Sequence, residues 1–212
     1  MNNTENNKLY LMNIFILDWD DTLFPTSWIK KNNIKDYDNY NLYFLELDKT
    51  ITLLLEKLYK IGSIYIVSNA TTTWIKKGLK KLPFTQNFIE NNGIEIISAR
   101  DIYSNKNVTP NEWKTNIFED LVDININMYK NNDKNTYFNI ISLGDADFEY
   151  VALIKLHKYL NNMNCDNYFL KNIRFIENPN FNSVIEQIDL VSYNINNISQ
   201  KLCYIDLNIL SI

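Results

Sequence analysis

Residues 15–24 are Phe-Ile-Leu-Asp-Trp-Asp-Asp-Thr-Leu-Phe, a short apolar run that ends in three acidic residues, Asp18, Asp20 and Asp21. Such a run is typical of a strand that is buried on both faces of a sheet. Carboxylates at its end repel one another and lose hydration, which is unfavourable unless a cation lies nearby. A hard ion such as Mg²⁺ takes oxygen ligands, and open α/β sheets bind ligands at this edge. An isolated Asp-x-Asp is more often a solvated acidic turn, but the apolar strand before it and Thr22-Leu23 after it favour a metal-binding motif.

The composition fits one globular domain that spans residues 1–212, of which 46% are hydrophobic. Roughly one residue in six is Asn, which we attribute to an AT-rich genome such as that of a virus or protist. The formal charge of −4 offers no basic surface for nucleic acid. The two cysteines, Cys165 and Cys203, have no paired spacing, so we expect neither a disulfide framework nor a zinc site.

The chain carries no sign of a membrane partner. No apolar run approaches the length of a bilayer span, and the polar N-terminal segment 1–12 lacks the pattern of a signal peptide. We therefore expect a cytoplasmic protein, located in the host cytoplasm if the source is a virus.

Strands and helices are predicted to alternate along the chain. Beyond the first strand, apolar runs predict strands at 64–67, 94–98, 138–143 and 173–176, and helical periodicity predicts helices at 42–61, 71–82, 110–128, 149–160 and 181–199. Between them we expect a polar loop at 25–41, a helix end at Pro83 and a turn at 131–135. The tail 200–212 is apolar enough to pack on the body, for which an edge strand is one arrangement.

This alternation predicts a three-layer α/β/α, Rossmann-like fold with a central, mostly parallel sheet of five strands. Parallel strands share one direction, so the residues that follow them lie at the same edge of the sheet. We expect Asp18, Asp20, Ser68 and Asp145 to converge on one crevice at that edge. Asp21 is expected to face solvent or to cap the next turn.

These residues, in this order, resemble the motifs of the haloacid dehalogenase (HAD) superfamily of phosphohydrolases over residues 15–176. The matching segments are Asp18-Trp19-Asp20-Asp21-Thr22-Leu23 after the first strand, Ser68-Asn69 after the second, a lysine before the fourth strand and Gly144-Asp145 after it. Lys114 matches the lysine best, and Lys106 is an alternative. Family members commonly carry Asp where this chain has Glu149, so either Asp147 or Glu149 would be the outer acid.

The resemblance implies a Mg²⁺-dependent phosphomonoester hydrolase. Mg²⁺ would be held by the Asp18 carboxylate, the Asp20 backbone carbonyl and Asp145. Asp18 would attack phosphorus to form an aspartyl-phosphate, and Asp20 would protonate the leaving oxygen and then activate water. Ser68, Asn69 and Lys114 would bind the phosphate, and Lys114 would also stabilise the charge of the transition state.

Specificity in this superfamily usually comes from inserted cap domains, and this chain leaves little or no room for one. We therefore expect a nearly capless enzyme with an open site, whose phosphorylated substrate is a small molecule or a macromolecule. One alternative is a phosphoprotein phosphatase resembling the capless RNA polymerase tail phosphatases, which share Asp-x-Asp-x-Thr. Another is a non-catalytic HAD-like module or a receiver-like signalling domain, although a receiver needs its phosphorylated Asp at the end of the third strand, where this chain has Ser98-Ala99-Arg100.

Overall fold

The protein is represented by a computed structural model that describes residues 10–129 and 136–209. The predicted turn at 131–135, residues 1–9 of the N-terminal segment and residues 210–212 of the tail lie outside these ranges.

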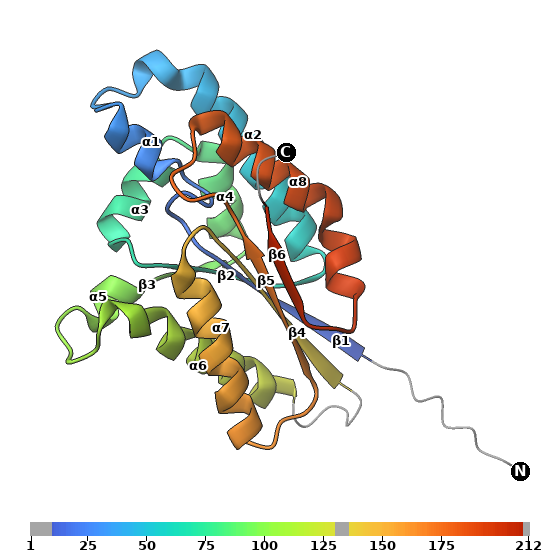
Figure 1. Ribbon diagram of the computed structural model, residues 1–212. Coiled ribbons are helices and arrows are strands. Elements are labelled where there is room, and N and C mark those ends of the chain that lie inside the picture. The colour runs from blue at the N-terminus through green and yellow to red at the C-terminus, as the bar shows by residue number, and fades with distance from the viewer. Residues whose placement is uncertain (1–9, 130–135, 210–212) are drawn as a thin grey trace, which may run out of the picture.

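Six parallel strands form one sheet in the order β3-β2-β1-β4-β5-β6 (Figure 1). Their bounds are β1 Tyr10–Leu17, β2 Gly62–Ser68, β3 Glu95–Ser98, β4 Thr136–Gly144, β5 Tyr168–Arg174 and β6 Ile205–Asn208. The predicted α/β class and the parallel sheet are confirmed, but the strand count of five is wrong. The sixth strand comes from the C-terminal tail, where β6 pairs in parallel with β5 and forms an edge of the sheet.

Helices cover both faces of the sheet and make the three layers (Figure 1). One face carries α1 Thr26–Lys31, α2 Asn41–Tyr59, α3 Thr72–Leu79, α4 Pro83–Asn91 and α8 Phe181–Gln200, and the other carries α5 Ala99–Tyr103, α6 Pro110–Tyr129 and α7 Asp147–Asn162. Each layer buries its own apolar cluster against the sheet. Alternate side chains of the central strands therefore point into different cores, which is why these strands are apolar without a break.

Three short helices were not predicted. The expected loop at 25–41 contains α1 and the 3₁₀ turn η1 Asp38–Tyr40, α5 follows β3, and α4 begins at Pro83, where only a helix end was expected. In α4 the N-cap residue Leu82 has no side chain that can cap. The Asp48 carboxylate of α2 accepts hydrogen bonds from the backbone N–H groups of Phe84 (2.9 Å) and Thr85 (2.7 Å) instead.

The position of β5 also differs from the prediction. The strand begins at Tyr168 rather than at 173, because it includes a buried lysine that interrupts the apolar pattern. Lys171 Nζ donates hydrogen bonds to the carbonyl oxygens of Ile198 (2.7 Å) and Lys201 (2.6 Å), at the C-terminal end of α8. A cation at this end of a helix interacts favourably with the helix dipole, although burial lowers the pKa of Lys171 to about 8.

Strand register determines which residues meet at the carboxyl edge. Leu17 of β1 pairs with Ile66 of β2 on one side and with Leu143 of β4 on the other. The Asp18 N–H continues the ladder by donating to the Leu143 carbonyl oxygen at 2.8 Å. The segments that follow β1, β2 and β4 therefore start level with one another.

None of the helices in the described ranges combines the length and apolar character of a bilayer-spanning helix.

Candidate active site

The turn after β1 is held by its own backbone. The Trp19 carbonyl oxygen accepts hydrogen bonds from the N–H groups of Leu23 (3.0 Å) and Phe24 (2.8 Å), and the Asp21 N–H donates to the Phe24 carbonyl oxygen at 2.7 Å. The Trp19 and Phe24 rings stack with centroids 5.4 Å apart. Asp21 has a φ of 56°, a left-handed conformation that Asp tolerates better than most residues. The turn thus presents Asp18 and Asp20 in a compact loop.

Asp21 caps the next helix rather than facing solvent. Its carboxylate is buried and accepts hydrogen bonds from the Ser27 N–H at 2.8 Å and from the Ser27 hydroxyl. Ser27 lies in the first turn of α1, whose N–H groups have no partner within the helix. The expectation that Asp21 caps the following turn is confirmed, and the alternative that it faces solvent is wrong.

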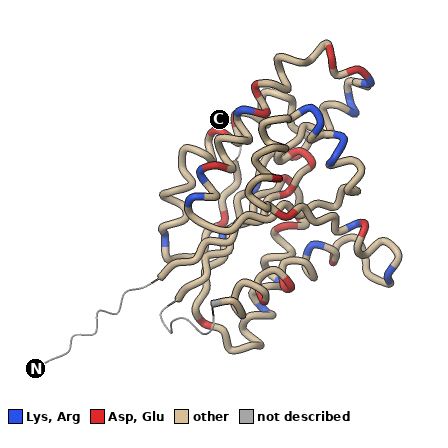
Figure 2. The backbone as a smooth tube through the Cα atoms, turned by 180° about the vertical axis from the view of Figure 1, so that it is seen from behind, with Lys and Arg blue, Asp and Glu red and all other residues tan. Residues whose placement is uncertain are grey.

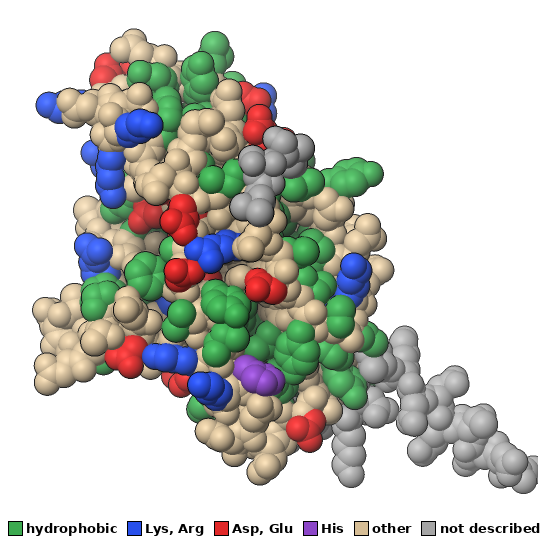
Figure 3. All heavy atoms as spheres, viewed as in Figure 1, with side chains coloured by type: hydrophobic (Ala, Val, Ile, Leu, Met, Phe, Trp, Pro, Cys, Tyr) green, Lys and Arg blue, Asp and Glu red, His purple; other side chains and the backbone are tan. Residues whose placement is uncertain are grey.

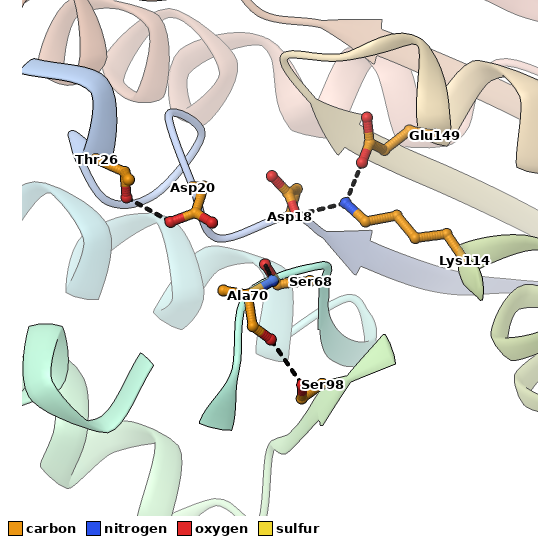
Figure 4. Close-up of polar contacts among 8 residues, drawn as sticks. All are labelled: Asp18, Asp20, Thr26, Ser68, Ala70, Ser98, Lys114 and Glu149. Carbon is orange, nitrogen blue, oxygen red and sulfur yellow. Dashed lines mark hydrogen bonds and ion pairs between the residues drawn. The ribbon is translucent and has the colours of Figure 1, made fainter. Parts of the chain in front are cut away.

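Asp18, Lys114 and Glu149 form a buried chain of charges (Figure 4). Lys114 Nζ lies 2.5 Å from Asp18 Oδ1 and also forms an ion pair with Glu149 Oε1. The three side chains come from the end of β1, the first turns of α6 and the start of α7. Of the two lysines considered from the sequence, Lys114 is therefore the one that contacts Asp18. The Lys106 ammonium lies over the Tyr103 ring instead, 4.7 Å from its centroid.

The lysine holds its proton firmly. Burial alone would lower the pKa of Lys114, but the Asp18 and Glu149 carboxylates outweigh this effect and raise its pKa above the usual value. For Asp18, burial raises the pKa to about 7 even though Lys114 acts in the opposite direction. A buried carboxylate with a neighbouring lysine and a pKa near neutrality is typical of functional sites.

The same charged groups also affect the pKa of Asp145. Burial, followed by the charges of Asp18, Glu149 and Asp21, raises the pKa of Asp145 to about 8, and the opposing effect of Lys114 is smaller. The Lys114 ammonium contacts only two of these carboxylates, those of Asp18 and Glu149. In addition, Glu149 Oε2 is buried and has no hydrogen-bond partner among the residues that the structure describes. This surplus of buried negative charge is what a bound cation would neutralise.

The donor set expected for Mg²⁺ has the oxygen chemistry that this ion requires. Among residues 10–129 and 136–209, no three His, Cys, Asp or Glu side chains gather as a metal site built from side chains alone requires. The expected set is of a different kind, because it combines the carboxylates of Asp18 and Asp145 with the backbone carbonyl of Asp20. All three ligands are oxygens, as Mg²⁺ prefers.

Asp147 and Glu149 have different partners. The Asp147 carboxylate is largely exposed and pairs with Arg174 at 2.8 Å, outside the buried charges. Glu149 is buried and contacts Lys114. Of the two acids that the sequence left open, the structure thus brings Glu149 into the site.

Ser68 lies at the end of β2, below the acidic turn (Figure 4). Its buried hydroxyl oxygen accepts a hydrogen bond from the Ala70 N–H at 3.0 Å, which leaves the hydroxyl proton free to donate. The loop is fixed from β3, because the Ser98 hydroxyl donates to the Ala70 carbonyl oxygen at 2.6 Å. Asn69 Oδ1 is buried without a hydrogen-bond partner in the described part of the chain. The Ser68 hydroxyl proton therefore suits a phosphate oxygen, whereas Asn69 Oδ1 is itself an acceptor and does not.

Asp20 is held by two residues that sequence reasoning missed. Its Oδ1 atom accepts hydrogen bonds from the Thr26 hydroxyl and from the indole Nε1–H of Trp74, the latter at 2.9 Å. Thr26 lies in α1 and Trp74 in α3. No local pattern could have linked Trp74 to Asp20, because Trp74 is 54 residues away and looks like any aromatic residue on an amphipathic helix.

Several acidic residues lie near this edge in Figure 2 and Figure 3. Figure 2, which shows the molecule from behind, has several acidic positions close together at the carboxyl edge of the sheet. The space-filling view shows acidic side chains near the middle of one face, with the single histidine, His157, well away from them (Figure 3). His157 Nδ1 is 2.9 Å from the Tyr168 hydroxyl, on the part of the molecule formed by α7 and β5.

No protein-family model and no curated protein matches the sequence.

Proposed function

We propose that this chain is a Mg²⁺-dependent phosphomonoester hydrolase of the HAD-like type, which acts through an aspartyl-phosphate on Asp18. The observation that carries the proposal is the buried Asp18–Lys114–Glu149 chain of charges at the carboxyl edge of a parallel sheet. Asp20 and Ser68 border the same edge (Figure 4). The arrangement supports a carboxylate nucleophile beside a fixed positive charge, rather than a merely structural ion pair.

In the first step the Asp18 oxygen that is not bound to Lys114 attacks phosphorus. The bond from phosphorus to the leaving oxygen breaks, and Asp20 gives its proton to that oxygen. When bound by Asp18, the Asp20 carbonyl and Asp145, Mg²⁺ would supply the charge that offsets repulsion between the Asp18 carboxylate and the phosphate dianion. Lys114 keeps its charge throughout, and the Ser68 hydroxyl and the backbone N–H of Asn69 donate to the phosphoryl oxygens.

In the second step water releases phosphate. Asp20, now ionised, accepts a proton from the water as the water oxygen bonds to phosphorus. The bond between phosphorus and the Asp18 oxygen breaks and restores both carboxyl groups to their starting states. The same two aspartates thus act in both half-reactions.

A screen of phosphate esters with Mg²⁺ and with EDTA tests the proposal. We expect hydrolysis that requires Mg²⁺, and a loss of about 10³-fold or more in Asp18→Asn, which keeps the size of the side chain but removes its nucleophilic charge. Asp166→Asn is the matched control, because Asp166 is exposed and precedes β5, at the opposite end of the sheet. Full activity of Asp18→Asn would exclude Asp18 as the nucleophile, and the absence of turnover of every ester would favour the non-catalytic alternative.

A phosphoprotein substrate is the second candidate, and the segment between β1 and α2 favours it. Residues 25–40, all of which are described, contain only the six-residue α1 and the 3₁₀ turn η1. A site without a cap domain can accept a phosphorylated side chain on a folded or extended partner. A panel of phosphopeptides measured beside small esters tests this candidate, and turnover of the small esters alone would reject it.

A further inference from the structure

We propose that Trp74 is a positioning residue that fixes the orientation of the Asp20 carboxylate for proton transfer. The inference rests on the proposed phosphatase function, because it concerns the step in which Asp20 protonates the leaving oxygen. It begins from an unequal distribution of hydrogen bonds on the two Asp20 oxygens.

Both donors contact the same oxygen of Asp20. Oδ1 accepts from the Thr26 hydroxyl and from Trp74 Nε1–H at 2.9 Å, and the same indole N–H lies 3.4 Å from Thr26 Oγ1. No described residue donates a hydrogen bond to Oδ2. Figure 4 shows this second oxygen on the side of Asp18, with Thr26 on the opposite side.

This asymmetry assigns different tasks to the two oxygens. With two donors already on Oδ1, the proton of the neutral carboxyl group belongs on Oδ2, which faces the reacting centre. The oxygen that releases a proton to the leaving group must face the reacting centre, since proton transfer occurs only within hydrogen-bond reach of the acceptor. Rotation of the carboxyl group would bring the proton to the wrong side of the turn.

Trp74 is itself held rigidly. It lies in the first turn of α3, where its backbone N–H donates to the hydroxyl of the N-cap residue Thr71 at 3.2 Å. Its ring packs edge-on against Phe24, with centroids 6.2 Å apart and an interplanar angle of 80°. Because α3 follows the Ser68 loop, the indole ties the phosphate-binding loop to the acidic turn. A tryptophan supported in this way can direct a carboxylate, whereas a mobile side chain cannot.

Trp74→Phe removes the indole N–H while it keeps an aromatic ring against Phe24. An ester with a good leaving group, p-nitrophenyl phosphate, needs little protonation, but an alkyl phosphate depends on it. We therefore expect kcat for the alkyl ester to fall about 10- to 100-fold, which is part of the roughly 10²- to 10⁴-fold that general acid catalysis contributes, and kcat for the p-nitrophenyl ester to fall less than about 3-fold. KM should change little for either ester. Thr26→Val, which removes the other donor, should show the same dependence on leaving group.

Trp28→Phe is the matched control, because Trp28 lies in α1 and packs against Tyr40 and Phe181, away from Asp20. It should not discriminate between the two esters. A second measurement is independent of turnover: the indole N–H resonance that disappears in Trp74→Phe should move upfield in Asp20→Ala.

The outcomes separate the two proposals. If the wild-type chain hydrolyses esters but Trp74→Phe loses both activities equally or neither, or if the indole resonance is unmoved in Asp20→Ala, the role of Trp74 is overturned while the phosphatase proposal stands. If the wild-type chain hydrolyses neither ester with Mg²⁺, the phosphatase proposal and this role fail together.

Discussion

Lys114 lies between two buried carboxylates, and this position makes each member of the trio depend on the others. Removal of one partner from a buried ion pair leaves an uncompensated charge, which commonly costs about 3–5 kcal/mol. The ammonium of Lys114 compensates Asp18 on one side and Glu149 on the other. A substitution that displaces Glu149 without removing its charge therefore tests whether stability and activity depend on the contact between Glu149 and Lys114.

Gly144→Ala is such a substitution. A Cβ atom at position 144 would lie 2.4 Å from Glu149 Cδ, so the Glu149 side chain must leave the position in which it contacts Lys114. We expect a loss of stability of about 1–3 kcal/mol from this overpacking and a fall in ester hydrolysis of at least about 10-fold. Urea unfolding and steady-state kinetics measure the two effects.

The control for this prediction is the double variant Gly144→Ala, Glu149→Ala. The second substitution removes the Cγ and Cδ atoms that a Cβ atom at position 144 would meet, so the two substitutions together should destabilise the protein by less than the sum of their separate effects. A Gly144→Ala protein as stable and as active as the wild type would show that Glu149 is not confined as described.

The N-terminus of α4 is capped by a side chain from another helix, α2. The Asp48 carboxylate, fully buried in α2, accepts the first free N–H groups of α4 and places negative charge at the positive end of its dipole. The hydroxyl of Thr85 also donates to the Asp48 carbonyl oxygen, at 3.2 Å. The cap therefore links α2 and α4 more firmly than apolar packing alone.

We expect Asp48→Ala to lower the free energy of unfolding by about 1–3 kcal/mol, because two buried N–H groups lose their acceptor. Asp48→Asn keeps one acceptor oxygen and should cost less. Glu46→Ala, on the exposed side of the same helix, is the control and should change stability by no more than about 0.5 kcal/mol. Equal effects of Asp48→Ala and Glu46→Ala in denaturant unfolding would contradict this account of α4.

At the scale of the whole molecule, the acidic edge makes stability depend on pH. The folded-state pKa of Asp145 is raised to about 8 from an ordinary value of 3.8. Between these values the native state binds more protons than the unfolded state, so stability in the absence of metal falls as pH rises from about 4 to about 8. Asp18, whose pKa is raised to about 7, acts in the same direction.

Asp145→Asn should remove part of this dependence. Near pH 4 the variant and the wild type should be similar in stability without metal, and at pH 8 the variant should be more stable by about 1 kcal/mol or more, since one pKa unit corresponds to about 1.4 kcal/mol. Thermal unfolding in EDTA across this pH range measures the difference. Addition of Mg²⁺ at pH 8 should stabilise the wild type but have a smaller effect on the variant. A difference between the two proteins that does not vary with pH would refute this role of Asp145.

The sequence by itself determined the parallel α/β sheet and the edge at which its acidic residues meet. The apolar strands carry this information locally, and parallel strands necessarily bring the residues after them to one edge. Asp18, Ser68 and Asp145 could therefore be placed together without knowledge of any long-range contact. The preference for Lys114 came from the resemblance to the HAD motifs, which have a lysine on or near the helix before the fourth strand.

Contacts between polar side chains of different elements depended on tertiary packing. Lys114 contacts Glu149 rather than Asp147, Trp74 donates to Asp20, and Asp48 caps α4, and each of these contacts joins residues that are far apart in the sequence. The pairing of β6 with β5 also depends on packing between segments. The same holds for the buried Lys171 of β5, because the carbonyl groups that accept its hydrogen bonds come from the end of α8. Periodicity records which face of an element is buried, but a hydrogen bond between elements depends on packing that no single segment encodes.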